Sequence, residues 1–154
     1  MSGEVTRQAM NKMWVGAFAV SLLIPGVAHA TQLITEEEAR LPPPIGAIAA
    51  DRRGILRGPR VEVVLPGETV HSPLRLQLKF EAFGGAKIDP ESVKVIYLRT
   101  PNVDLTSRAK PFIRRDGINI LDAELPAGEY TLRVDVKDTD GRPASTIFTL
   151  KVEP

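Results

Sequence analysis

The chain has 154 residues and a formal net charge of +1, so it has room for one domain with additional segments. This charge gives no reason to expect a nucleic-acid partner or a strongly acidic substrate. The chain contains no cysteine, which excludes disulfides, thiolate metal sites, a cysteine nucleophile and a lipid-modified cysteine. A domain of this composition must be held together by its apolar core alone.

Residues 1–30 have the pattern of a cleavable secretory signal peptide. Arg7 and Lys12 provide the positive start, residues 14–23 are an apolar run, and Ala28 and Ala30 place small residues before a cleavage point. A retained membrane anchor is the alternative, but the run is well short of the ~20 residues that span a bilayer. Without a twin arginine, we expect Sec-type export, cleavage after Ala30, no transmembrane segment afterwards, and a periplasmic or secreted protein.

Residues 31–59 are predicted to form a linker. Thr35 can cap one helical turn with Glu38 as its capping-box partner, and Pro42–Pro44 stops that turn and favours an extended conformation. Residues 46–60, which reach the start of the next region, have no period of 2 or 3.6, and they are basic. Their arginines suit either a solvated linker, which we prefer, or contact with anionic lipid or an acidic partner. They are Arg52, Arg53, Arg57 and Arg60.

Residues 60–154 show the alternation of apolar and polar residues that is typical of half-buried strands. Six stretches carry it, separated by turn-forming residues such as Gly84-Gly85 and Pro126–Gly128. They are residues 61–65, 74–80, 93–98, 118–125, 130–137 and 148–152. Several short strands with regular turns predict an all-β sandwich or barrel.

Motifs in this region resemble those of bacterial immunoglobulin-like domains of exported proteins. The motifs are Val61–Pro66, Ile88–Val95, Leu125–Leu132 and Val136–Gly141. The resemblance implies an immunoglobulin-like antiparallel β-sandwich of about seven strands, with Tyr130 as its corner tyrosine. It implies no common catalytic site, so no catalytic residue and no cofactor are expected.

The connection at residues 101–117 is too long for a plain turn. Ile96 and Leu98 would face outward on a simple sandwich, and we expect apolar residues of this connection to fold back and cover them. Its basic residues around an apolar pair form the candidate partner-binding surface, and a solvated loop with inward apolar residues is the alternative. The candidate residues are Arg108, Lys110, Phe112, Arg114 and Arg115.

Other candidate sites have simpler structural explanations. Asp135, Asp138 and Asp140 lie near one turn and leave calcium open, but aspartate is also a common hairpin residue. His71 and Ser72 are neighbours on a strand and would point to opposite faces, which argues against a catalytic triad. Copper sites in sandwich proteins use clusters of histidine and methionine. After cleavage one histidine and no methionine or tryptophan would remain, so copper and glycan sites have little support.

The sequence therefore predicts a non-catalytic interaction or structural module whose partner is a cell-envelope or extracellular protein. A small-ligand or ion-binding accessory protein, for calcium or a glycan, is the alternative.

Overall fold

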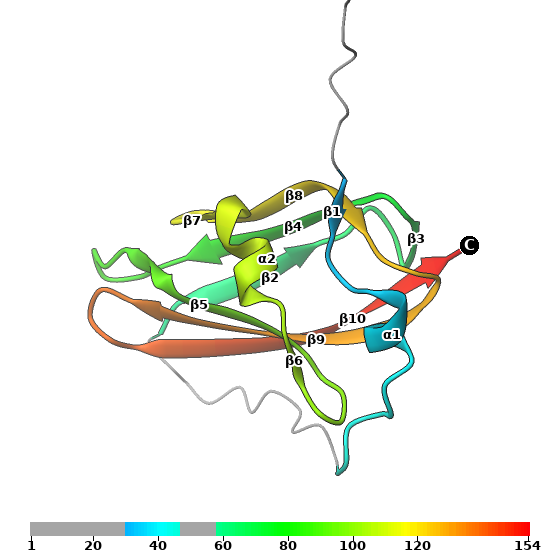
Figure 1. The fold of residues 1–154 in the computed structure, drawn as a ribbon. Coiled ribbons are helices and arrows are strands. Elements are labelled where there is room, and N and C mark those ends of the chain that lie inside the picture. The colour runs from blue at the N-terminus through cyan, green and yellow to red at the C-terminus, as the bar shows by residue number, and fades with distance from the viewer. Residues whose placement is uncertain (1–29, 47–57) are drawn as a thin grey trace, which may run out of the picture.

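A computed structural model describes residues 30–46 and 58–154 of the chain. Residues 1–29 of the predicted leader and the arginines at positions 52, 53 and 57 lie outside these residues. The described chain forms two five-stranded sheets that pack face to face (Figure 1). One sheet contains, in spatial order, β1 (Thr31–Gln32), β8 (Gly117–Glu124), β4 (Leu74–Glu81) and β2 (Arg60–Val64), with β7 (Ile113–Arg114) also paired to β8. The other contains β3 (Thr69–His71), β10 (Pro143–Glu153), β9 (Gly128–Asp138), β5 (Ile88–Tyr97) and β6 (Val103–Asp104).

The two packed sheets confirm the predicted all-β sandwich, with two short parallel pairings, β1 with β8 and β3 with β10, beside the antiparallel ones. Between β2 and β4, which pair in the first sheet, the chain crosses to the second sheet, where β3 runs parallel to the last strand, β10. The central pairings of the second sheet, β10 with β9 and β9 with β5, are antiparallel. No helix in the described residues has the length and apolarity of a membrane span.

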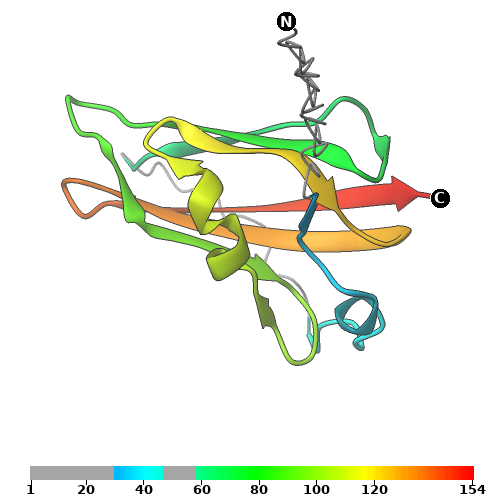
Figure 2. The same cartoon turned by 45° about the horizontal axis from the view of Figure 1, so that its top comes forward.

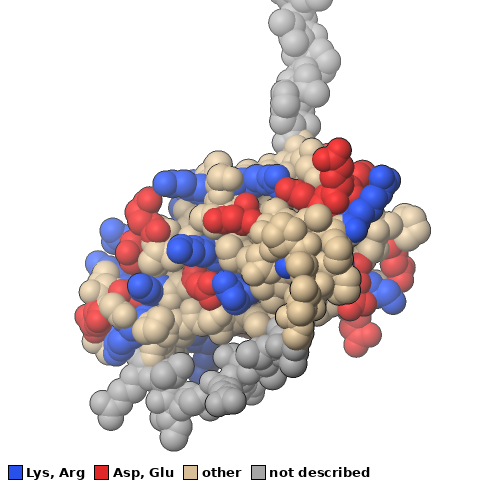
Figure 3. All heavy atoms as spheres, turned by 60° about the horizontal axis from the view of Figure 1, so that its bottom comes forward, with Lys and Arg blue, Asp and Glu red and all other residues tan. Residues whose placement is uncertain are grey.

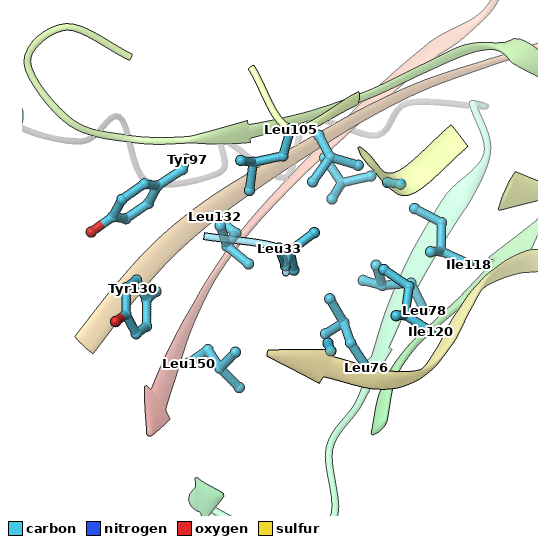
Figure 4. Packing of buried hydrophobic residues seen from close by; sticks show 14 of the residues in the cluster. Leu33, Leu76, Leu78, Tyr97, Leu105, Ile118, Ile120, Tyr130, Leu132 and Leu150 are labelled. Atoms are coloured by element: carbon cyan, nitrogen blue, oxygen red, sulfur yellow. The ribbon is translucent and has the colours of Figure 1, made fainter. Parts of the chain in front are cut away.

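The core lies between the inner faces of the two sheets, because alternate residues of each strand point inward. Strand β4 shows the pattern most clearly, and Figure 4 shows Leu76 and Leu78 of this strand on the opposite side of the core from Tyr130 and Leu132 of β9. Each fully buried side chain of this size contributes about 1.5–3 kcal/mol before ordering costs. The predicted strands therefore supply most of the core.

The segment that follows Ala30 differs from its predicted role as a linker. Strand β1 runs parallel to β8, and the next two residues, Leu33 and Ile34, have no exposed surface. The predicted capping box of Thr35 and Glu38 is present at the start of helix α1 (Glu36–Ala39). The domain boundary is thus corrected to include this part of the segment. Only Leu33 and Ile34 are fully buried among residues 31–43, too few to form a periodic pattern.

The connection at 101–117 also takes a different course from the expected one. It passes from β6 in one sheet to β7 in the other through helix α2 (Thr106–Ala109) and the 3₁₀ helix η1 (Lys110–Phe112), and so closes one side of the sandwich (Figure 1). Leu105 and Ile113 join the core instead of covering the outer face of β5. Leu98 is nevertheless buried, and Ile96 is half-buried.

Candidate functional site: the loop end of the sandwich

Three connections and the start of β2 meet at one end of the sandwich, which we call the loop end. The connections are residues 82–87, 115–116 and 139–142, and Figure 2 shows them grouped opposite the C-terminus. The register places them together, because Arg60 pairs with Glu81 and Lys79 pairs with Gly117. In immunoglobulin-like sandwiches, loops cluster at the two ends of the sheets and are the usual carriers of recognition.

Hydrogen bonds join two of these loops. The amide of Thr139 donates to the carbonyl of Lys87 at 2.8 Å, and the amide of Lys87 donates to Thr139 Oγ1 at 3.1 Å. Arg142 Nη2 donates to the carbonyl of Phe83 at 2.9 Å. The two loops therefore brace each other, which lowers the ordering cost of any binding event at this end.

Asp138, the last residue of β9, holds the shape of the turn at residues 139–142. Its buried carboxylate accepts from the amides of Asp140 and Arg142 at 3.0 and 2.9 Å, and from Arg142 Nε at 2.7 Å. Burial alone would raise the pKa of Asp138, but the hydrogen bonds and charge of Arg142 outweigh it and hold this pKa below its ordinary value. Asp138 is therefore an ionised structural residue.

The three aspartates considered for calcium do not form a ligand set. Asp138 is occupied by Arg142, and Asp140 Oδ2 also lies 3.0 Å from this guanidinium. Asp135 accepts from Ser145 Oγ at 2.6 Å and Arg133 Nε at 3.1 Å. Across residues 30–46 and 58–154, no three acidic or histidine side chains are grouped to hold a metal ion.

Phe83 is the exposed aromatic residue of the loop end, and the sequence analysis did not single it out. Its surface is 38% exposed, and the guanidinium carbon of Arg60 lies 5.6 Å from its ring centroid. Aromatic and arginine side chains are enriched at protein interfaces. Residues of β4 alternate between the two faces, and Phe80 points inward. Phe83, three positions later, is therefore expected to point outward, just before the Gly84-Gly85 turn.

The structure does not bring the five predicted partner-binding residues together. Arg108 is directed to the N-terminal segment, where it binds Glu38 and the carbonyl of Leu33. Phe112 is half-buried and packs against the core, while Lys110 Nζ lies 3.2 Å from a carboxylate oxygen of Glu91.

Arg114 and Arg115 are the members of that set at the loop end. Both are exposed, and Arg115 lies in the turn between β7 and β8. Arg114 Nη1 donates to the carbonyls of Pro111 and Ile113 at 3.2 and 3.1 Å, so its stem lies along its own segment. The alternative of a solvated loop thus describes the part of this connection at Arg114 and Arg115. The turn at residues 115–116 belongs to the loop end.

A shallow groove lies on the outer face of the second sheet, with a volume of about 470 Å³. It forms where the register of β5 against β9 shifts between Asp89 and Lys94. Its two serine hydroxyls bind other residues of the groove: Ser145 donates to Asp135, and Ser92 Oγ accepts from the amide of Lys137 at 2.8 Å. Figure 3 shows acidic and basic side chains interspersed over the face that it presents. The groove is thus lined by charges of both signs and favours no single class of ligand.

Tyr130 is the corner residue, as the sequence predicted. Its hydroxyl donates to the carbonyl of Pro126 at 2.7 Å, and its ring lies 5.5 Å from that of Tyr97, centroid to centroid. Burial, and secondarily the neighbouring Tyr97, raises the pKa of Tyr130 to about 12. Tyr130 is therefore a neutral, buried structural residue at any physiological pH.

His71 and Ser72 lie at the end of β3, and they have separate environments. His71 is exposed, whereas Ser72 Oγ accepts a hydrogen bond from the amide of Leu125 at 3.1 Å. The serine thus satisfies backbone in the connection before β9.

Comparisons with known proteins add little to this description. No protein-family model matches the chain, and no curated protein matches its sequence. Among solved structures, the fold is similar to that of CopC from Methylosinus trichosporium OB3b. The sequence identity is 18% and the TM-score is 0.41, over 62% of this chain and 95% of that chain. Similarity at this level carries no information on ligand or function.

Proposed function

We propose that this protein is a non-catalytic, exported interaction module of the bacterial immunoglobulin-like type, which binds a cell-envelope or extracellular protein through its loop end. The observation that carries the proposal is Phe83, an exposed aromatic residue on a loop braced by Arg142 and covered on one side by Arg60. A braced loop loses little entropy on binding, and an aromatic side chain beside arginine is the composition of interface hot spots.

The partner surface should combine an apolar contact with carboxylates. Phe83 supplies the apolar part, while Arg114 and Arg115 supply exposed positive charge at the same end. Arg60 and Arg142 are already paired with Glu81 and Asp138, so they position the site more than they attract a partner. Opposite charges would mainly raise the rate of encounter and set orientation.

The absence of catalysis is supported by what the reactive side chains do. Ser72 binds the amide of Leu125, and Asp138 binds Arg142 and the turn backbone. Both side chains therefore serve structural contacts in the fold. Export is supported by the leader pattern at residues 1–30.

Affinity capture from envelope extract tests the proposal, with the mature protein as bait and mass spectrometry as the readout. A specific partner should be retained by the parent chain and lost with Phe83→Ala. The matched control is Leu121→Ala, because Leu121 is also exposed, at 59%, but lies on a bulge of β8 away from the loop end.

The double variant Arg114→Ala with Arg115→Ala should weaken capture, more so at low salt than at high salt. If Leu121→Ala removes the partner while Phe83→Ala retains it, the loop end is the wrong surface. A rise in melting temperature with millimolar calcium or with envelope glycans, without protein capture, would instead favour the ligand-binding alternative.

A further inference from the structure

The predicted cleavage point lies at the edge of the folded domain. Thr31, the residue after the predicted scissile bond, is the first residue of β1 and pairs with Ala123 of β8. Leu33 and Ile34, two and three positions further on, are completely buried. At about 3.3 Å per strand residue, the scissile bond is within ~10 Å of the first fully buried side chain.

The backbone that follows the scissile bond is hydrogen-bonded into the first sheet. The amide of Leu33 donates to the carbonyl of Glu124 at 3.0 Å, and Thr31 and Gln32 are in parallel register with β8. A protease that binds its substrate as an added strand needs an extended segment that the rest of the fold leaves accessible. The stretch around Thr31 therefore cannot pair with β8 and enter a protease groove at the same time.

Side chains further along hold β1 in place. Arg108 of α2 donates to the carbonyl of Leu33 at 2.9 Å and to both carboxylate oxygens of Glu38. Thr100 adds two hydrogen bonds, from its amide to the carbonyl of Pro42 and from its hydroxyl to the carbonyl of Pro43, both at 3.0 Å. Freeing β1 together with Leu33 requires at least the hydrogen bond from Arg108 to Leu33 to break.

We infer that docking of β1 and removal of the leader are mutually exclusive, so the leader is removed before the sandwich closes and a folded precursor resists cleavage. The inference rests on the proposed export. The reaction is hydrolysis of the Ala30–Thr31 bond, in which water supplies hydroxyl to the Ala30 carbonyl carbon and hydrogen to the Thr31 nitrogen. Folding of β1 thus limits the time in which the protein can be released from its leader.

The test compares cleavage of the full-length precursor, residues 1–154, in two states by purified signal peptidase in detergent. One sample is folded beforehand, and the other is diluted from urea directly into the protease. Product beginning at Thr31 is followed by mass spectrometry. We expect the folded sample to react at least about tenfold more slowly, because cleavage then depends on local opening of β1.

Variants separate this effect from general instability. Arg108→Ala should speed cleavage of the folded precursor by about 10- to 100-fold, since it removes charged hydrogen bonds that hold β1. The milder Glu38→Gln serves if Arg108→Ala does not fold. Lys151→Ala removes an exposed basic side chain on β10, which belongs to the other sheet and does not pair with β1, and should react like the parent.

Three outcomes are distinguishable. Slow cleavage of the folded parent and faster cleavage of the Arg108→Ala precursor support the inference. Equal cleavage rates for the folded and urea-diluted parent overturn it and leave the leader assignment intact. Failure of both samples to yield product at Thr31 overturns the leader assignment, and the inference with it.

Discussion

The guanidinium of Arg108 holds both carboxylate oxygens of Glu38, at 2.7 and 2.8 Å, across 70 positions of the chain. Glu38 also accepts from the amide of Thr35, as the reciprocal half of the capping box. One carboxylate therefore closes helix α1 on itself and ties it to α2. The pair is only partly exposed, with 33% and 19% of the two side chains accessible, so solvent screens it less than a surface ion pair.

This pair should make stability depend on acid pH. The hydrogen bond from Arg108 lowers the pKa of Glu38 from 4.5 to about 2, against the opposing effect of burial and with help from Thr35. Because the folded-state pKa is the lower one, its stabilisation is fully present above the unfolded pKa and is lost as pH falls from about 4.5 towards 2. Urea unfolding at pH 7, 4.5, 3.5 and 2.5 would measure this loss of unfolding free energy. Its size is set by the difference between the folded and unfolded pKa of Glu38.

The control for that titration is Glu38→Gln, which keeps the size of the side chain and removes its charge. The variant should be less stable than the parent at pH 7, and the difference should shrink as the pH falls to 2.5. Parallel stability curves for the two proteins over this range would show that other carboxylates account for the acid sensitivity.

Leu33 should behave as a core residue in spite of its place near the N-terminal end of the described fold. Leu33→Ala removes a completely buried side chain and should cost about 2–5 kcal/mol of unfolding free energy. Leu121→Ala, at an exposed position, should change stability by less than about 0.5 kcal/mol. Denaturant unfolding of both variants checks this, and a silent Leu33→Ala would return residues 31–43 to a linker outside the domain.

Tyr130 is predicted to stabilise the corner through both its hydroxyl and its ring. Tyr130→Phe loses the hydrogen bond to Pro126 and should cost about 1–2 kcal/mol. Tyr130→Ala also opens a cavity beside Tyr97 and should cost about 3–5 kcal/mol. The comparison is made by thermal and urea unfolding, and unchanged midpoints for both variants would mean that this corner is not formed.

The connection at 101–117 should divide into a structural part and a solvent-exposed part. Phe112 packs against the core while half-buried, so Phe112→Ala should cost about 2–4 kcal/mol, towards the lower end of that range. Arg114→Ala with Arg115→Ala should leave the unfolding free energy nearly unchanged. The opposite pattern would mean that Phe112 is available for docking.

Processing after Ala30 should change the fluorescence of the protein. The single tryptophan of the chain, Trp14, lies in the predicted leader, while both tyrosines lie in the sandwich. The exported protein should therefore show tyrosine emission only, with a mass that begins at Thr31. Tryptophan emission from purified exported protein would contradict cleavage at this point.

Local residue patterns were sufficient to predict the strands of five or more residues and the corner. Alternation is a local property of a strand, so Leu74 to Phe80 and Tyr130 to Val136 revealed which side chains face the core without knowledge of their partners. The corner is equally local, since Tyr130 reaches the carbonyl of Pro126, four positions earlier. The capping box of Thr35 and Glu38 spans only three positions and was predicted for the same reason.

Roles that depend on distant partners became visible in the folded chain alone. Nothing in the local sequence around Arg108 distinguishes it from Arg115, yet one binds Glu38 and the other lies in an exposed turn. Leu33 and Ile34 form too short an apolar pair to predict a strand, and they are buried because β8 offers a free edge for parallel pairing. Pairing between segments far apart in the chain is set by the packing of the whole core, which no local pattern of residues encodes.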